Sequence, residues 1–341
     1  MEDGIVFNGP IIVDKHNFID FFPKEGQIGE IYDTSQSLGG IMNIMLDLHK
    51  LDFKVPISIN SVVGIGQDGA FVKEEFEKKL PDVNCSGFKY EGKNAFTLVL
   101  NSASTKQRTF FSFTGNFDNF DASYIDWENQ KGKYFLLEYL FLGKKLNLNH
   151  QKYGTYAGEI LYKAKKQGFI TAVDMASHYT PNAIQIAESA LKHTDICAIN
   201  EIEAETATGI KITDENGILE NKAGEALFKM KEMGVSTWAI IHSPSENYGL
   251  DCQSGKLYKV PSLKLPKSFI VGTVGAGDAF FSGVLYGAYQ KFDIIKAIQL
   301  GTATAACSLS KNNGTDGIKP LKETWKVFEK YKEEVTFKQL N

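Results

Sequence analysis

The sequence predicts an α/β protein of three layers, in which helices cover both faces of a mostly parallel central sheet. Short runs of β-branched and aromatic residues alternate with segments whose apolar residues have helical spacing. This alternation is typical of βαβ units, whose strands run parallel. Two extended segments, about 15–38 and 94–116, break the alternation. We expect them to form a small β-sheet that acts as a lid on a cleft, within one domain over residues 1–341.

The expected strands are short and rich in Val, Ile, Phe and Tyr: Ile5–Val13, Ile57–Val63, Ala95–Leu100, Thr109–Phe113, Tyr134–Leu142, Ile170–Val173, Ile196–Ile199 and Trp238–Ile241. The helices expected between them are Ile41–Leu51, Phe71–Leu80, Tyr153–Lys166, Pro181–Lys192 and Ala223–Met233. The last part of the chain is mainly helical, with Ala279–Gln290, Asp293–Ser310 and Leu321–Tyr331.

Composition and charge limit the partners of the protein. Its 341 residues are 43% hydrophobic and 23% charged, which is ordinary for a soluble globular protein. There are 37 basic and 41 acidic residues, so a nucleic-acid backbone would meet no basic surplus. The most apolar stretch, Tyr134–Leu142, is too short to cross a membrane and contains Glu138. We therefore expect neither a nucleic-acid partner nor a membrane partner.

The cysteine pattern and the N-terminus favour a cytoplasmic location. The four cysteines are far apart and include no Cys-x-x-Cys pair, which is typical of reduced, buried thiols. Residues 1–4 are acidic and lack the basic and apolar regions of a signal peptide. The six histidines show no metal-ligand spacing.

A glycine-rich turn followed by an acidic residue, Gly272–Asp278, is the strongest local motif. Gly275 and Gly277 carry no side chains, so backbone N–H groups can converge on an anion at the start of the following helix. Asp278 would repel a phosphate, but it suits a base that takes a proton from a hydroxyl during phosphoryl transfer. A simpler interpretation, in which Asp278 only caps its helix, fits the same residues.

The segment Gly275-Ala276-Gly277-Asp278-Ala279-Phe280 resembles the C-terminal signature of the PfkB/ribokinase family of sugar and nucleoside kinases. Further segments resemble motifs of this family in the same order along almost the whole chain: Asp14, Ser37–Asn43, Val63–Gly69, Asn200–Glu203 and Thr315–Ile318. The resemblance implies a ribokinase-like α/β/α fold with a β lid. It also implies an ATP-dependent phosphotransferase that acts on a hydroxyl of a free sugar or sugar derivative.

The resemblance assigns roles to individual residues. Asp278 would be the general base, and the N–H groups of Gly275, Ala276 and Gly277 would stabilise the developing charge. The residues assigned to the acceptor are Asp14, which is expected to end the first strand, and Gly39, Gly40 and Asn43. Those assigned to the ATP phosphates are Asn200, Glu203, Ser243, Thr273 and Gly277, and Glu203 is also assigned to a hydrated Mg²⁺. Asn200 and Glu203 also form a capping-box pattern, and both interpretations can hold together.

The chain departs from the family pattern at several positions. Gly272 stands where many members have an Asp that helps to hold a monovalent cation, so we expect weak or absent K⁺ dependence. Leu38 replaces a Gly, Gly66 replaces an Asp, and the segment at Ser243 lacks the usual Lys-Gly. These changes leave the core chemistry in place and affect only the positions that set cation and acceptor specificity.

The acceptor and some alternatives stay open. Residues 35–47 contain no Lys or Arg, which favours an uncharged acceptor, and Arg108 in the lid is expected to be a solvated strand residue. A nucleoside kinase that accepts an adenosine-like molecule and a non-catalytic nucleotide-binding protein are the alternatives. The literal G-x-G-x-x-G at 64–69 would suggest an oxidoreductase, but that interpretation leaves Asp278 unexplained. Family lids often pair between subunits, so we expect that a homodimer can form through the lid.

Overall fold

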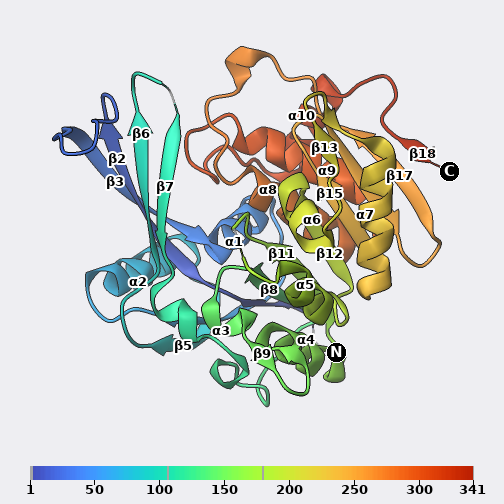
Figure 1. The fold of residues 1–341 in the computed structure, drawn as a ribbon, viewed down its shortest axis with the longest axis horizontal. Helices are drawn as coiled ribbons and strands as arrows, with labels where there is room; N and C mark the ends of the chain where they lie inside the picture. The colour runs from blue at the N-terminus through green and yellow to red at the C-terminus, as the bar shows by residue number, and fades with distance from the viewer. Residues whose placement is uncertain (1–2, 106, 179, 341) are drawn as a thin grey trace.

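A computed structural model describes residues 3–105, 107–178 and 180–340, so Met1 and Glu2 of the acidic N-terminus lie outside the described residues. A large sheet contains β1 (Ile5–Asn8), β4 (Ile57–Val63), β5 (Asn84–Tyr90), β8 (Tyr134–Leu140), β11 (Ile170–Met175), β12 (Ile196–Asn200), β15 (Trp238–His242), β16 (Glu246–Asp251), β17 (Lys256–Pro261) and β18 (Lys338–Leu340). A small sheet contains β2 (Ile11–Ile19), β3 (Ile31–Gly40), β6 (Phe96–Ser102) and β7 (Arg108–Phe113). Both sheets are visible in Figure 1.

The helices are α1 (Ile41–Lys50), α2 (Gln67–Lys79), α3 (Lys144–Asn147), α4 (Tyr156–Lys166), α5 (Ala183–Leu191), α6 (Glu201–Thr208), α7 (Glu220–Met233), α8 (Ala276–Tyr289), α9 (Ile294–Ser308) and α10 (Leu321–Tyr331). Short hairpins are formed by β9 (Asn149–His150) with β10 (Gly154–Thr155) and by β13 (Thr213–Asp214) with β14 (Gly217–Ile218). Short 3₁₀ helices lie at Gly115–Asn119, Ala122–Tyr124 and Lys267–Phe269.

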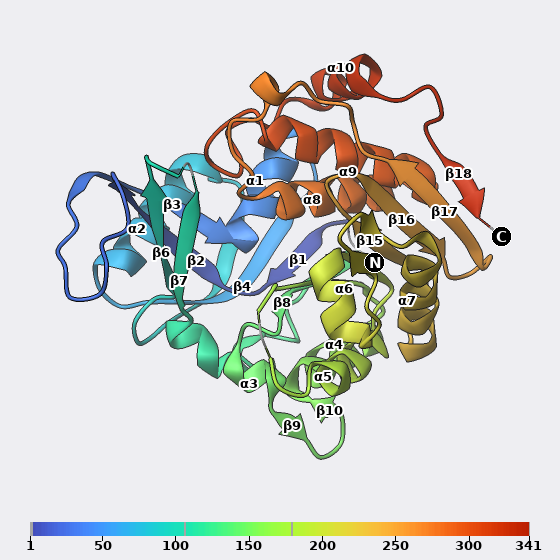
Figure 2. The same ribbon diagram turned by 45° about the horizontal axis from the view of Figure 1, so that its top comes forward.

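The large sheet lies between two helical layers, as the sequence predicts. Its order is β18-β17-β16-β15-β12-β11-β8-β1-β4-β5. The strands from β5 to β15 pair in parallel, whereas β16, β17 and β18 extend the sheet in antiparallel fashion. Figure 2 shows α1, α8 and α9 on one face and α4, α5 and α7 on the other. Each face buries an apolar core of its own, because successive strand residues point to opposite sides.

The chain leaves the large sheet earlier than the sequence suggested. One strand was expected over Ile5–Val13, but β1 ends at Asn8 and β2 begins at Ile11 in the other sheet. A side chain at Gly9 would overlap the carbonyl oxygen of Glu138, and Pro10 offers no N–H to a ladder. The expectation that Asp14 ends the first strand is therefore wrong, because Asp14 lies within β2.

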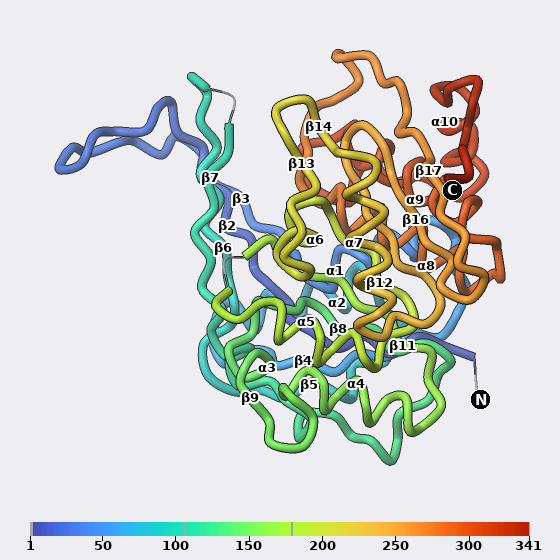
Figure 3. The backbone as a smooth tube through the Cα atoms, turned by 45° about the vertical axis from the view of Figure 1, so that its right-hand side comes forward, coloured from blue at the N-terminus to red at the C-terminus, as the bar shows by residue number. Residues whose placement is uncertain are grey.

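The predicted small sheet is present, with the order β3-β2-β6-β7. Strand β2 pairs antiparallel with β3 and parallel with β6, which pairs antiparallel with β7. Its first two strands run from Ile11 to Gly40, slightly beyond the expected limits of 15 and 38, and its last two run from Phe96 to Phe113, within the expected limits of 94 and 116. Figure 3 shows the β2–β3 connection extending away from the rest of the chain.

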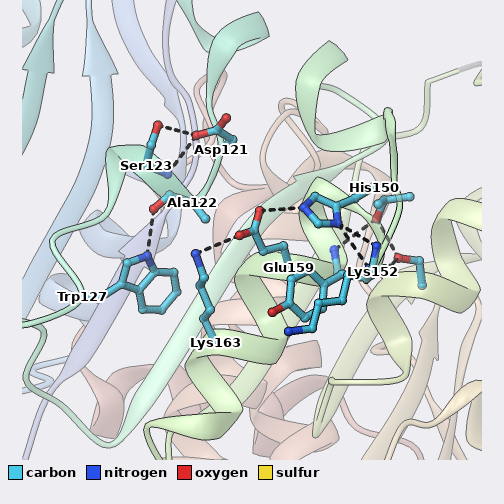
Figure 4. A network of polar contacts seen from close by, with 12 residues as sticks. Asp121, Ala122, Ser123, Trp127, His150, Lys152, Glu159 and Lys163 are labelled. Atoms are coloured by element: carbon cyan, nitrogen blue, oxygen red, sulfur yellow. Dashed lines mark hydrogen bonds and ion pairs between the residues drawn. The ribbon is translucent and has the colours of Figure 1, made fainter.

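A polar network holds the β9–β10 hairpin against α4 (Figure 4). His150 Nδ1 accepts the backbone N–H groups of Lys152 and Tyr153, at 3.2 and 3.3 Å. Because Nδ1 is an acceptor, the hydrogen of the neutral ring lies on Nε2, which is 3.7 Å from Glu159 Oε2. Lys163 Nζ also binds Glu159, at 2.8 Å. The network therefore serves to fix the β9–β10 hairpin on α4.

Within the part of the chain that the structure describes, every helix is too short or too polar to span a lipid bilayer.

Candidate active site

A cavity of about 320 Å³ lies where β8, β11, β12 and β15 end beside the start of α8. The carboxyl ends of these parallel strands meet at one edge of the sheet, which is where α/β proteins of this kind bind ligands. The polar residues and glycines that line the cavity are Tyr139, Asp174, Ser177, Asn200, Glu203, His242, Thr273, Gly275, Gly277 and Asp278, together with Ala276. A larger depression of about 780 Å³ over α5 and α6 shares only Ser177 with it and contains none of the predicted site residues.

The glycine-rich turn has the backbone that an anion site needs. Gly275 has φ 74°, in the left-handed region, and a Cβ atom there would come 2.5 Å from Gly314 Cα. Helix α8 begins at the next residue, so its first N–H groups have no partner within the helix. A Cβ atom at Gly277 would face the His242 ring at 3.6 Å. The turn therefore presents unshielded N–H groups and the positive end of a helix dipole to the cavity.

Asp278 is held by side chains from two other parts of the fold. Asn43 Nδ2 donates to Oδ2 at 2.7 Å, and Tyr139 OH donates to Oδ1 at 2.8 Å. The carboxylate is therefore not engaged as a helix cap, and each oxygen keeps acceptor capacity for a ligand. Burial raises the pKa of Asp278, whereas the bonds from Asn43 and Tyr139 lower it.

The sequence did not single out Tyr139. It is the second-last residue of β8, a strand that is otherwise buried, so its pattern signals only core. Its only distinguishing signal is a polar hydroxyl at the carboxyl end of a parallel strand.

Other acidic groups surround Asp278. Burial and the charge of Asp278 raise the pKa of Asp14 to about 7, against a smaller opposite effect of Thr97. Burial also raises the pKa values of Asp174 and Glu138 well above their usual range, and both residues are buried. Neither residue is recognisable as part of a site from the sequence, because a single acidic residue in an apolar strand has no characteristic spacing.

This concentration of carboxyl groups suits a divalent cation that keeps its water. Glu203 and Asp174 are buried at the cavity and offer oxygen atoms, the donors that Mg²⁺ prefers. Within residues 3–105, 107–178 and 180–340, no group of three or more His, Cys, Asp or Glu is arranged to hold a metal ion directly. Mg²⁺ is usually held through one or two carboxylates, waters and substrate phosphates, and this donor set fits that pattern.

The capping box of α6 is formed, and it also faces the cavity. Asn200 Oδ1 accepts Glu203 N–H, and Glu203 Oε2 accepts Asn200 N–H, both at 2.9 Å. Ser177 Oγ donates to Glu203 Oε1 at 2.8 Å. Burial raises the pKa of Glu203 to about 7, although the bonds from Asn200 and Ser177 oppose the rise. The structural interpretation of this pair is thus confirmed, and its role toward ATP and metal stays a prediction.

The predicted acceptor residues approach Asp278 from the small sheet and α1. Asp14 lies against β3, where a Cβ atom at Gly39 would come 2.5 Å from its Oδ2. Gly40 has φ 69°, and a side chain there would overlap the carbonyl oxygen of Pro10. These two glycines let β3 turn directly into α1, which carries Asn43 to the Asp278 carboxylate.

The predicted ATP residues divide into two groups. Thr273 lines the cavity together with Asn200 and Glu203. Ser243 is instead engaged in the turn between β15 and β16, where its Oγ donates to Glu246 O at 2.7 Å. The Ser243 hydroxyl also accepts the Glu246 N–H at 3.2 Å. Its contact with nucleotide phosphates stays a prediction.

Arg108, the only arginine in the chain, is not the solvated strand residue that the sequence suggested. Its Nη1 is buried with no partner among the described residues, and its Nη2 donates to Asn312 Oδ1 at 3.4 Å. A Cβ atom at Gly272 would come 3.2 Å from Nη2. Arg108 therefore reaches from β7 to Gly272, the first residue of the glycine-rich turn, and to Asn312 in the loop after α9.

The family model of the pfkB family carbohydrate kinases matches residues 11–320. The protein therefore belongs to this family, as the sequence motifs predicted, and the oxidoreductase interpretation is excluded. A 5-dehydro-2-deoxygluconokinase from Bacillus licheniformis is 28% identical over 114 residues, which cover 32% of this chain and 34% of that protein. A ribokinase from Haemophilus influenzae is 27% identical over 169 residues, covering 49% of each chain. The matched segments thus span less than half of these relatives.

The fold is also shared with solved structures. A ribokinase from Arabidopsis thaliana, complexed with ribose and ATP, superposes with a TM-score of 0.76 at 17% identity. The match covers 96% of this chain and 99% of that chain. This likeness confirms the predicted ribokinase-like three-layer fold with a small separate sheet.

Proposed function

We propose that this protein is an ATP-dependent kinase that phosphorylates a hydroxyl of a free sugar or sugar derivative. The observation that carries the proposal is the position of Asp278 in the first turn of α8. Its carboxylate accepts hydrogen bonds from Asn43 and Tyr139, and Asp278 lines the same cavity as Gly275, Ala276 and Gly277 of the glycine-rich turn. A base and an anion site are therefore adjacent, as phosphoryl transfer to a hydroxyl requires.

In this mechanism the chain mainly positions groups and stabilises charge. Asp278 accepts the proton of the acceptor hydroxyl as that oxygen attacks the γ-phosphorus in line. The N–H groups of Gly275, Ala276 and Gly277 stabilise the charge that develops on the transferring phosphoryl oxygens. Asn43 and Tyr139 hold the carboxylate in place, and Asp14 binds acceptor hydroxyls.

Mg²⁺ would be held through water by Glu203 and Asp174, with Asn200 beside them. When bound, it neutralises phosphate charge in a cavity that already carries several carboxyl groups.

The names of the relatives support a sugar-derived acceptor. One relative is a 5-dehydro-2-deoxygluconokinase and another is a ribokinase, and both names state a sugar-derived acceptor. Arg108 Nη1, which has no partner in the described part of the chain, adds a positive charge near Gly272, and this favours an anionic group on the substrate or nucleotide at this point.

The proposal is tested by measuring ADP release from Mg-ATP with a panel of free sugars, sugar acids, sugar phosphates and nucleosides. We expect one sugar or sugar acid to raise ADP release above the background of Asp278→Asn. Activity confined to nucleosides would contradict the sugar-derived acceptor and identify the protein as a nucleoside kinase. ATP binding with no release across the panel would favour a non-catalytic nucleotide-binding protein.

A further inference from the structure

The buried carboxyl group of Asp47 lies on α1, next to the helix that carries the proposed base, and the mechanism does not use it. Asp47 follows Asn43 by one turn of α1, and Ser282 follows Asp278 by one turn of α8. The two helices pack side by side, as Figure 2 shows. Asp47 is 0% exposed, within the apolar core between α1, α8 and α9.

The hydrogen bonds of Ser282 indicate which atom carries the proton. A serine hydroxyl has one hydrogen, and Ser282 Oγ lies 2.7 Å from the carbonyl oxygen of Asp278, to which it donates. Asp47 Oδ2 lies 3.4 Å from the same Oγ. Because the serine hydrogen is already engaged, this second contact is a hydrogen bond only if Asp47 supplies its own hydrogen.

The surroundings of Asp47 offer little to stabilise a negative charge. Its Oδ1 has no hydrogen-bond partner in the described parts of the chain. Lys50, on the same helix, donates to the carbonyl oxygen of Thr315 at 2.8 Å and to Asp316 Oδ1 at 3.2 Å. An ionised carboxylate is costly when it is buried among apolar side chains, accepts at most one long contact from a hydroxyl, and has its nearest lysine engaged elsewhere.

The charged and titratable groups around Asp47 agree with the geometry. Burial, followed by the negative charge of Asp278 on α8, raises the pKa of Asp47 well above its usual range. Lys50 on α1 and the Ser282 hydroxyl lower it, with smaller effects. On α9, burial raises the pKa of the Cys307 thiol to about 11, so that neighbour is neutral.

We propose that Asp47 is a protonated carboxylic acid at neutral pH and a positioning residue for Asp278. Its O–H donates to Ser282 Oγ, whose hydrogen fixes the backbone carbonyl of Asp278 in the first turn of α8. Of the two carboxyl groups, Asp47 is then neutral, and the single negative charge lies on Asp278, which faces the substrate. The positioning role rests on the proposed function, whereas the protonation state of Asp47 does not.

The protonation state is tested by comparing the unfolding of wild type and Asp47→Asn in denaturant at several pH values. An Asp that is protonated only in the folded state must release its proton on unfolding, so it destabilises the fold as pH rises above its ordinary pKa of 3.8. Asn is a neutral isostere that titrates no proton. We therefore expect the unfolding equilibrium constant of wild type to rise about tenfold, relative to that of Asp47→Asn, for each unit of pH between 3.8 and the raised pKa.

Ser282→Ala is the matched control, because it disturbs the same contact but leaves the carboxyl group in place. We expect this variant to keep the pH dependence of wild type. A difference between wild type and Asp47→Asn that does not change with pH would overturn the proposal. Failure of Asp47→Asn to fold would also overturn it, because a protonated Asp should be replaceable by Asn.

The positioning role is tested with the acceptor that the ADP-release panel identifies. We expect Asp47→Ala to lower kcat about tenfold with little change in KM for ATP, and Asp47→Asn to restore most of that loss, because the amide N–H can donate to Ser282. Equal kcat values for the two variants would overturn this role. The unfolding measurement needs no kinase activity, so failure of the proposed function and failure of this inference are distinguishable.

Discussion

At the scale of single residues, the environment of Asp278 combines one predicted partner with one that the sequence did not reveal. Asn43 belongs to a segment with a recognisable family pattern, and its amide binds the carboxylate at 2.7 Å. Tyr139 binds the other oxygen, but it lies near the end of a strand whose residues otherwise look like core. Arg108 was misjudged because a strand residue of alternating pattern carries no sign of what faces it in space.

Tyr139→Phe tests the second of these contacts. The bond from Tyr139 lowers the pKa of Asp278, so its loss raises that pKa. A base acts in its ionised form, and the acid limb of the pH–rate profile should therefore move to higher pH. A hydrogen bond to a charged group predicts a loss in kcat of about 10- to 100-fold near neutral pH. An unchanged acid limb would show that Tyr139 does not tune the base.

At the scale of elements, most strands and helices of the large sheet could be predicted. The helices α1, α7, α8 and α10 and the strand β4 lie close to their expected limits, because their apolar spacing is regular and their ends carry Gly or polar residues. The change of sheet between β1 and β2 could not be predicted, because the apolar pattern runs on through Gly9 and Pro10. The antiparallel strands β16, β17 and β18 were also missed, since their sequences alternate only weakly.

The turn before α8 gives a prediction at this scale. Gly275→Ala places a Cβ atom 2.5 Å from Gly314 Cα at a residue with φ 74°. The turn must then shift, and its N–H groups no longer point toward the transferring phosphoryl group. We expect turnover to fall at least tenfold, which is about 1.4 kcal/mol of transition-state stabilisation.

Gly26→Ala is the matched control for this substitution. Gly26 has φ 80°, and a Cβ atom there would meet nothing within 4 Å. The Gly26→Ala variant therefore has similar backbone strain but no steric clash at its Cβ atom. Equal activity of the two variants would contradict the role of the turn.

At the scale of the whole molecule, the small sheet presents two different faces. Asp14 and Arg108 lie on the face toward the large sheet. Leu98 pairs with Phe111 on the opposite face, where Phe113 follows two residues later. These three apolar side chains are 37%, 56% and 41% exposed, and neighbouring exposed apolar side chains of this kind often mark an interaction site.

This apolar face supports the prediction that two lids pair in a homodimer. One chain weighs 37.9 kDa, and we expect light scattering after size-exclusion chromatography to give twice this mass. Phe111→Lys should shift the protein to a monomer, whereas Phe228→Lys, which changes an exposed residue of α7, should not. A monomeric wild type would contradict this prediction.

The most direct test of the account is the turnover of Asp278→Asn with the accepted substrate, measured together with ATP affinity. Asn keeps the shape of the side chain but cannot take the hydroxyl proton. We predict a fall in kcat of about 10²–10⁴ with ATP binding largely intact, while the surface control Asp82→Asn behaves as wild type. Turnover of Asp278→Asn close to that of wild type would contradict the assignment of Asp278 as the base.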